Sequence, residues 1–290
     1  MQSLWLSRRR TTNLNTRNNR TLSHSPGVSG DTAFQEMAEH NQTRHWMTTS
    51  CILSFQCRLT TYLYLITMYP VKENLKKTKE TLAEGVKLVA VSKFHPKEYI
   101  EEAYAVGQRI FGESREQELR TKHTELPEDI RWHFIGHLQT NTVKAIVPYV
   151  SMIETIDSLR LLKEVNKQAE KIGRTIDVLL ELHIAKEETK SGMTPEEWRG
   201  LLAEGEWKNL NHIRICGIMM MASNVDDKEQ IKSEFLEAAA FFDEIKAQYF
   251  ADAPYFTERS YGMSGDYLIA QQCRSTMVRI GTSIFGPRVY

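Results

Sequence analysis

The apolar positions of this chain fall into short continuous runs, separated by stretches with helical spacing. The clearest run is Val-Lys-Leu-Val-Ala-Val-Ser-Lys at residues 86–93, which Phe94, His95 and Pro96 follow. A short run rich in valine is typical of a parallel strand buried on both faces, and a proline then suits the start of a helix. The pattern predicts a strand that places Lys93 at its carboxyl end, where a shielded lysine loses its proton more easily. Taken alone, the run also fits a solvated loop lysine.

The rest of the chain alternates strands and helices with short connections. Further strands are predicted at residues 109–111, 132–135, 150–155, 176–184, 213–219, 259–261 and 277–280. Helices are predicted at residues 71–82, 96–106, 140–147, 158–173, from 194 onward, 228–249 and 266–273. Ser158 is a typical N-cap, and Thr194, Pro195 and Glu197 combine an N-cap, a first-turn proline and a capping-box glutamate. Each strand but the last is therefore followed by a helix or a helical turn.

Eight strands in this order are the pattern of a (β/α)8 barrel. Such barrels usually have roughly 250 residues, which is close to the length of chain that follows Met68. An open, doubly wound sheet is the alternative, but no Gly-x-Gly-x-x-Gly motif follows the first strand. We therefore expect an α/β fold, a TIM-type (β/α)8 barrel that forms a single domain over residues 68–290.

Residues 1–67 have a different character. They are basic and polar over much of their length and lack apolar periodicity, which predicts disorder. Three interpretations fit: an arginine-rich targeting peptide, a weak signal anchor in the apolar stretch of residues 51–71, or translation that begins at Met68, so that the preceding residues are misannotated. We favour the third, because a coherent amphipathic helix begins just beyond Met68.

Charge and cysteine content narrow the function classes. The chain has 37 basic and 37 acidic residues, so no overall field attracts nucleic acid or a membrane surface. The cysteines show neither a disulfide framework nor metal-ligand spacing, and they are Cys51, Cys57, Cys216 and Cys273. This usage indicates a reducing, cytoplasmic compartment.

Closing the barrel would bring several distinctive segments to one rim, at the carboxyl ends of the strands. These are Lys93, residues 112–114 and 136–139, Asp157, Met219, and residues 262–265 and 279–282. The sequence Tyr-Gly-Met-Ser-Gly-Asp at residues 261–266 offers free backbone N–H groups, the Ser264 hydroxyl and a helix start, which suit a phosphate. After the last strand, Gly281 allows close approach of the backbone, and Thr282 offers N–H and hydroxyl donors. Either segment alone fits an ordinary turn, but together, opposite a first-strand lysine, they predict a phosphate site.

Five segments resemble the pyridoxal phosphate homeostasis proteins, single-domain relatives of the alanine racemase barrel. They are Ala-Val-Ser-Lys at residues 90–93, Phe-Gly-Glu at 111–113, Trp-His-Phe-Ile-Gly-His-Leu-Gln-Thr-Asn at 132–141, Gly-Met-Ser-Gly-Asp at 262–266 and Val-Arg-Ile-Gly-Thr-Ser-Ile-Phe-Gly at 278–286. The resemblance covers the chain from about Met68 to its C-terminus, in order. One position departs from the family pattern, because Ser114 stands where an asparagine usually follows Phe-Gly-Glu.

The resemblance implies a cofactor and a role for six residues. Lys93 would hold pyridoxal 5′-phosphate as an internal aldimine, and Arg279 would face the pyridine nitrogen. The phosphate would bind to the loops that carry Met263, Ser264, Gly281 and Thr282. No contact near the cofactor is assigned to Ser114. The implied function is the binding, intracellular homeostasis and supply of pyridoxal phosphate, with PLP-dependent apoenzymes as possible recipients and the protein a monomer.

The chemistry of Arg279 argues against strong catalysis. An arginine is always charged and cannot donate its proton to the pyridine nitrogen, so it disfavours a protonated ring and weakens the electron sink that carbanion chemistry needs. The alternative interpretation is an arginine paired with a carboxylate inside the barrel. His133 and His137 lie at a strand end, where a structural, hydrogen-bonded histidine is more common than a base.

Two other classes of function stay open. A PLP-dependent racemase would use this barrel with a second, mostly β domain that carries a tyrosine base, and the sequence stops at Tyr290, shortly after Gly286. A Schiff-base aldolase also needs a barrel lysine and a phosphate site, but it usually carries the lysine on a later strand. We expect a protein that handles the cofactor without appreciable turnover.

Overall fold

Eight parallel strands close into a barrel in the order of the sequence. The computed structural model describes residues 69–184 and 191–287. Each strand pairs in parallel with the next, and the last pairs with the first, so the sheet has no open edge. The strands are β1 (Lys87–Val91), β2 (Ile110–Glu113), β3 (Arg131–Phe134), β4 (Met152–Ile156), β5 (Ile176–Leu182), β6 (Ile213–Met220), β7 (Glu258–Ser260) and β8 (Met277–Ile280). The predicted (β/α)8 barrel is confirmed.

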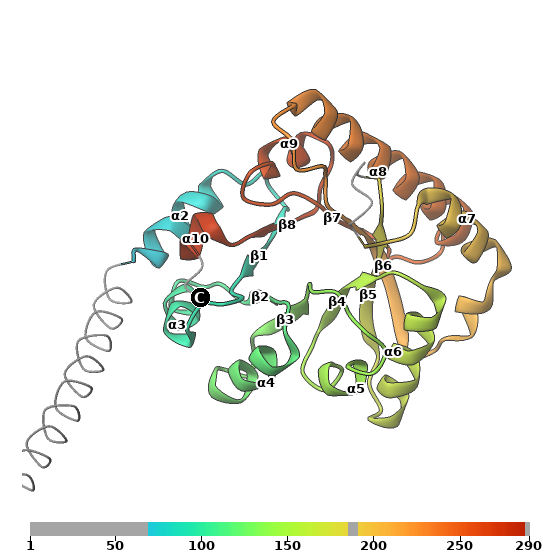
Figure 1. The fold of residues 1–290 in the computed structure, drawn as a ribbon, viewed down its shortest axis with the longest axis horizontal. Coiled ribbons are helices and arrows are strands. Elements are labelled where there is room, and N and C mark those ends of the chain that lie inside the picture. Colours follow the sequence, from blue (N-terminus) through green and yellow to red (C-terminus); the bar gives the residue numbers. More distant parts are fainter. Residues whose placement is uncertain (1–68, 185–190, 288–290) are drawn as a thin grey trace, which may run out of the picture. The chain divides into compact units, whose positions relative to one another are not determined.

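Helices surround the ring of strands (Figure 1). They are α2 (Val71–Glu80), α3 (Lys97–Ala105), α4 (Glu116–Glu125), α5 (Val143–Ile146), α6 (Leu159–Lys171), α7 (Pro195–Glu204), the 3₁₀ helix η1 (Glu206–Asn209), α8 (Lys228–Tyr249), α9 (Tyr267–Gln272) and α10 (Thr282–Phe285). Two differ from expectation. Helix α4 was not predicted, and β8 is followed by the short helix α10, which lies beside α2. The ends of the other elements agree with the predicted ranges to within a few residues.

The predicted capping box begins α7 as expected. The Thr194 hydroxyl accepts a hydrogen bond from the Glu197 N–H at 3.3 Å, and the Thr194 N–H donates to the Glu197 carboxylate at 2.8 Å. Pro195 occupies the first turn, where its missing N–H costs nothing. The helix ends at Gly205, whose φ of +75° is a left-handed conformation that glycine adopts without strain.

Two apolar layers hold the barrel together. The larger lies between the strands and the helices and contains most of the buried aliphatic and aromatic side chains. The smaller fills the interior of the barrel and consists of Val89, Ile110, Met152, Leu179, Cys216, Met219 and Met277. Because the strands are covered on both faces, they read in the sequence as continuous apolar runs and not as alternating ones.

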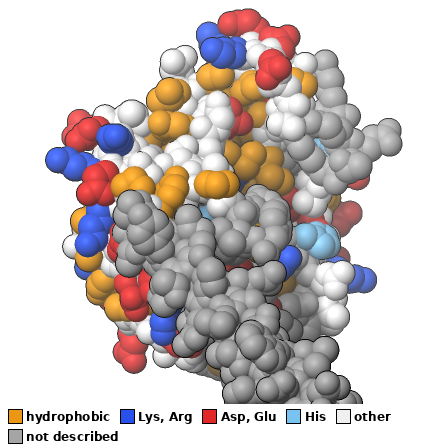
Figure 2. Space-filling view, turned by 60° about the vertical axis from the view of Figure 1, so that its left-hand side comes forward, with side chains coloured by type: hydrophobic (Ala, Val, Ile, Leu, Met, Phe, Trp, Pro, Cys, Tyr) orange, Lys and Arg blue, Asp and Glu red, His pale blue; other side chains and the backbone are white. Residues whose placement is uncertain are grey.

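The predicted extension, residues 1–67, lies outside the described residues. Among the helices that the structure does describe, none combines the length and the apolar character needed to cross a bilayer. On the face shown in Figure 2, acidic and basic side chains are interspersed, as the equal numbers of the two charges suggest. The cysteines in the described part, Cys216 and Cys273, are free and buried.

Candidate functional site

A pocket of about 240 Å³ lies at the carboxyl ends of the strands, on the rim where the sequence places its distinctive segments. All six residues predicted to hold a cofactor line it. The full lining is Val91, Lys93, His95, Ile135, Met221, Met263, Ser264, Gly265, Arg279, Gly281 and Thr282. Another cavity lies at the opposite mouth of the barrel, but neither Lys93 nor the two glycine-containing loops reach it. The carboxyl-end pocket is therefore the candidate site.

Lys93 lies in a turn that is held on both sides. Strand β1 ends at Val91, and the next residue, Ser92, donates from its hydroxyl to Glu113 at 2.6 Å. On the other side, the Phe94 N–H donates to the Glu118 carboxylate at 2.7 Å, and Phe94 has a φ of +66°. A left-handed conformation is costly for a bulky residue and persists only where its surroundings fix it. The half-buried lysine is thus carried by a backbone with little freedom.

The ammonium group of Lys122 ties these anchors together. It donates to the Ser92 carbonyl at 2.9 Å, to Glu113 at 2.8 Å and to Glu118 at 2.7 Å. Glu113 is completely buried, and this burial raises its pKa to about 7, although the Lys122 charge acts in the opposite direction. Its second oxygen, Oε2, has no hydrogen-bond partner among the described residues. The hydrogen-bonded groups that hold the Lys93 turn therefore include a carboxyl group, that of Glu113, which titrates near neutral pH.

The two predicted phosphate loops meet at the pocket. The Gly281 N–H lies 3.4 Å from the Ser264 hydroxyl oxygen, which joins the loop after β7 to the loop after β8. Gly281 also lies against strand β1, since a Cβ there would be 3.1 Å from the Val91 carbonyl oxygen. In the described part of the chain, no acceptor is bonded to the backbone N–H groups of Ser264, Gly265 and Thr282. Unused donors on adjoining loops are what an oxyanion requires.

The predicted helix start at this site contributes little beyond these donors. Helix α9 begins at Tyr267, after Asp266, and has only six residues, while α10 has four. The Asp266 carboxylate also accepts from the Met263 N–H at 2.5 Å, so a negative charge already occupies the start of α9. The peptide dipoles of a helix add along its length, so helices this short have a weak dipole. The backbone N–H groups and hydroxyls are therefore the important donors for an anion here.

Arg279 lines the pocket and is also paired with a carboxylate, as the alternative interpretation had it. Its Nη1 donates to the Ser260 carbonyl at 2.6 Å and hydroxyl at 2.7 Å, and its Nη2 donates to the Met220 carbonyl at 2.8 Å. Oε2 of Glu154 lies 3.7 Å from Nη1. Burial lowers the pKa of Arg279 and Glu154 opposes this, but an arginine keeps its charge in proteins.

Glu154 is a buried carboxylate that sequence reasoning missed. Burial would raise its pKa, but the hydrogen bond from His133 at 2.7 Å, the Arg279 charge and the Ser260 hydroxyl at 2.6 Å outweigh burial and hold that pKa below its ordinary value. The glutamate is therefore ionised and balances the arginine. A sequence signal existed, because a charged residue inside an apolar strand covered on both faces needs a partner.

Other predicted rim residues lie outside this pocket. Gly112 packs inside the sheet, where a Cβ would meet Val89 and Ile135 side chains at 3.0 Å. Gly136 lies against the Ser114 backbone, with 2.3 Å from a Cβ to the Ser114 carbonyl oxygen. His133 is buried and bonded to Glu154, whereas His137 is exposed and 3.8 Å from Asp157. His133 therefore has the structural, hydrogen-bonded surroundings expected of it, whereas His137 is a surface residue.

Several lining residues were missed by sequence reasoning. His95 comes from the same turn as Lys93 and stacks between Tyr99 and Phe285, with ring centroids 5.8 and 5.5 Å apart. Ile135 and Met221 each follow the last residue of a strand. Their position just beyond β3 and β6 was the available signal, because the first residues after barrel strands face the rim.

Fold and pocket define a class: a (β/α)8 barrel with an amine from the first strand opposite oxyanion donors from the last two. Comparison with known proteins places the chain within it. Residues 66–289 match the alanine racemase N-terminal domain family. The pyridoxal phosphate homeostasis protein of Aquifex aeolicus is 36% identical over 225 residues, covering 76% of this chain and 96% of that protein. The protein of the same name from Schizosaccharomyces pombe is 35% identical over 206 residues, 70% of this chain and 85% of that protein. The chain belongs to the pyridoxal phosphate homeostasis protein family.

Solved structures agree with this assignment. PipY of Synechococcus elongatus, solved with PLP bound, superposes with a TM-score of 0.68 at 34% identity, covering 74% of this chain and all of that one. An alanine racemase of Clostridium difficile superposes with a TM-score of 0.60 at 17% identity, over 75% of this chain and 56% of that one. At that identity the second likeness shows the fold alone. The resemblance found in the sequence is thereby confirmed.

Proposed function

We propose that this protein binds pyridoxal 5′-phosphate in the carboxyl-end pocket and serves its homeostasis and supply. One arrangement carries the proposal. The Lys93 turn forms one wall of the pocket, and the two joined loops, with the unused N–H groups of Ser264, Gly265 and Thr282, form another. Membership of the family and the PLP-bound structure of PipY support the same ligand.

The residues present fit the chemistry of this cofactor. When bound, pyridoxal phosphate supplies an aldehyde that forms a Schiff base with an amine, and a ring that withdraws electrons. Lys93 provides the amine. Ser264, Gly281 and Thr282, with Met263 beside them, bind the phosphate group through hydroxyl and N–H donors. Arg279 presents a fixed positive charge to the pyridine nitrogen, because Ser260, Met220 and Glu154 hold its guanidinium.

We further propose that the pocket holds the cofactor without strong turnover. Racemisation needs one group that removes a proton and another that delivers it from the opposite face. Among the described lining residues, the side chains able to do this are Lys93 and His95, and both come from the single turn after β1. Transfer of the cofactor to PLP-dependent apoenzymes is the corresponding role. The cytoplasmic location and the monomeric state stay predictions of the sequence.

Reduction with borohydride followed by peptide mapping tests the proposal. The pyridoxyl group is expected on Lys93. Lys97 provides a matched control, since it lies four residues further on and pairs with Glu125 at 2.9 Å outside the pocket. Lys93→Ala should abolish the label and the yellow colour, whereas Lys97→Ala should keep both. A label on another lysine, with Lys93→Ala still yellow, would remove the central claim.

A further inference from the structure

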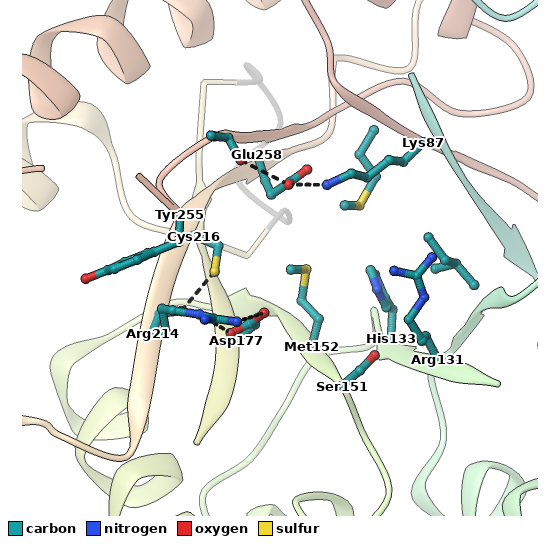
Figure 3. A pocket seen from close by; sticks show the side chains of 13 residues that line it. Lys87, Arg131, His133, Ser151, Met152, Asp177, Arg214, Cys216, Tyr255 and Glu258 are labelled. Carbon is teal, nitrogen blue, oxygen red and sulfur yellow. Dashed lines mark hydrogen bonds and ion pairs between the residues drawn. The ribbon is translucent and has the colours of Figure 1, made fainter. Parts of the chain in front are cut away.

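A second cavity, of about 270 Å³, opens at the opposite mouth of the barrel, where the strands begin. Its wall includes the first residues of six strands, which are Lys87 of β1, Ile110 of β2, Arg131 of β3, Met152 of β4, Glu258 of β7 and Met277 of β8. Figure 3 shows the side chains of Lys87, Arg131 and Met152 around one open space. The cofactor proposed above does not account for this amino-end cavity.

Most charges in the amino-end cavity are already balanced. Arg214 donates two hydrogen bonds to Asp177, at 2.7 and 2.8 Å, and Lys87 is paired with Glu258. Arg131 differs, because it forms no ion pair with any residue in the ranges 69–184 and 191–287. The lining therefore carries one surplus positive charge, on a planar group with a fork of donors that matches a carboxylate.

A second polar group stands beside that guanidinium. Figure 3 shows the His133 ring next to Arg131 on the same wall, across from Arg214 and Asp177. Nδ1 of His133 is bonded to the ionised Glu154, so it carries a proton. Its other nitrogen, Nε2, has no hydrogen-bond partner within the described chain. In the imidazolium form, this nitrogen carries an N–H group and is a donor toward the cavity.

The remaining lining limits the ligand. Ile110, Met152 and Met277 supply apolar surface next to the polar wall. The carboxylates of Asp177 and Glu258 are also part of the lining, and they would repel a dianion more than a monoanion. The volume of about 270 Å³ is just below the usual range of ligand pockets, which is about 300–1,000 Å³. These features favour a small ligand with a single negative charge and a short hydrocarbon chain.

We propose that the amino-end cavity is a second binding site, for a small monocarboxylate held by Arg131 and His133. The carboxylate of the ligand accepts hydrogen bonds from the Arg131 guanidinium and from Nε2–H of His133 in its imidazolium form. Its hydrocarbon part packs on Ile110, Met152 and Met277. This site is separate from the cofactor pocket, and the proposal does not depend on whether the cofactor binds.

Calorimetric titration of the full-length protein with acetate, propionate and butyrate tests the site. Each added methylene should tighten binding about four-fold, which corresponds to the transfer of one CH₂ group out of water. Inorganic phosphate should bind more weakly than butyrate. In protein labelled with ¹⁵N at the histidine rings, butyrate should shift the His133 signal, which a His133→Gln variant assigns.

Matched variants locate the binding. Arg131→Gln should weaken butyrate binding at least ten-fold, as expected for the loss of a charge-assisted contact of about 1.5–3 kcal/mol. Arg160→Gln, which removes an exposed arginine on α6, should leave it unchanged. Since the Arg131 side chain makes no ion pair within the described residues, the variant should fold normally, and thermal unfolding checks this. Equal effects of both variants, equal binding of butyrate and phosphate, or an unmoved His133 signal would each overturn the proposal.

Discussion

Oε2 of Glu154 lies 3.7 Å from Nη1 of Arg279, and both side chains are buried inside the barrel. The Ser260 hydroxyl bridges them, because it donates to Glu154 at 2.6 Å and accepts from Arg279 at 2.7 Å. Burying one charge alone is expensive, whereas a paired and hydrogen-bonded charge is tolerated. Glu154 therefore makes it possible for an arginine to face the proposed position of the pyridine ring.

Removing the charge of Glu154 tests this relationship. Glu154→Gln should destabilise the cofactor-free protein by about 3–5 kcal/mol, the usual cost of leaving one partner of a buried ion pair uncompensated. Urea unfolding measures the loss. Glu206→Gln is the matched control, since its carboxylate pairs with Lys163 on the surface, where such pairs contribute little. Equal stability of the two variants would mean that Arg279 does not depend on Glu154.

The phosphate loops give a second prediction. Ser264 and Thr282 each offer a hydrogen bond to an anion, worth about 1.5–3 kcal/mol, so the double variant Ser264→Ala, Thr282→Ala should retain pyridoxal phosphate far less well. Retention is read from the absorbance of the bound cofactor after gel filtration. Thr124→Ala, on the exposed face of α4, is the control. Pyridoxal without its phosphate should bind poorly to the unaltered protein, and equal affinity for both forms would show that these loops have another role.

The third prediction concerns how the stability of the fold depends on pH, and it rests on Glu113. Burial raises the pKa of this carboxyl group to about 7, above its ordinary value of 4.5. The folded protein then binds more protons than the unfolded chain between these values, so stability should fall as the pH rises from about 4.5 to 7 and level off above. The loss is at most about 3 kcal/mol.

Urea unfolding at a series of pH values measures this slope. Glu113→Gln should remove most of the decline, because glutamine does not titrate. Glu125→Gln should keep it, since Glu125 is an exposed carboxylate that pairs with Lys97. The contrary result is that the unaltered protein becomes more stable over this pH range and that Glu113→Gln shows the same pH dependence. The Glu113 carboxyl group would then be ionised throughout, and Lys122 would dominate its environment.

Long periodic segments could be predicted well from the sequence, and short polar ones could not. Helix α8 has the predicted bounds, 228–249, because its apolar side chains repeat over six turns. Helix α4 was missed because Leu119 is its only buried apolar residue, which leaves no period to detect. The other buried residue of the helix is Lys122, and long charged side chains often bury their aliphatic part.

The same distinction applies to the site. Lys93, Ser264 and Gly281 could be found because each stands at a strand end in a recognisable string. Glu154 and Ser260 are 106 positions apart and meet only across the closed barrel. No local pattern announces such a pair, although a lone carboxylate in the apolar strand β4 indicates that a partner exists.

The fourth prediction concerns residues 1–67, which we propose can be deleted without loss of folding or cofactor binding. The eight strands and their pairing are complete within the described residues, and the family match begins at residue 66. Thermal unfolding and cofactor titration of the full chain are compared with those of a chain that begins at Met68. A large drop in stability after truncation would mean that the segment packs on the barrel.

The last prediction is that the loaded protein does not turn over amino acids at rates typical of enzymes. Lys93 and His95 lie on one turn, and Arg279 would keep a fixed charge at the proposed position of the ring nitrogen without donating a proton. Mixing the holoprotein with a panel of amino acids in deuterated water reports exchange of the α-proton directly. We expect no exchange beyond that of the free cofactor. Exchange at about 1 s⁻¹ or faster would assign the protein to the racemases, and its loss in His95→Gln would identify the second acid–base group.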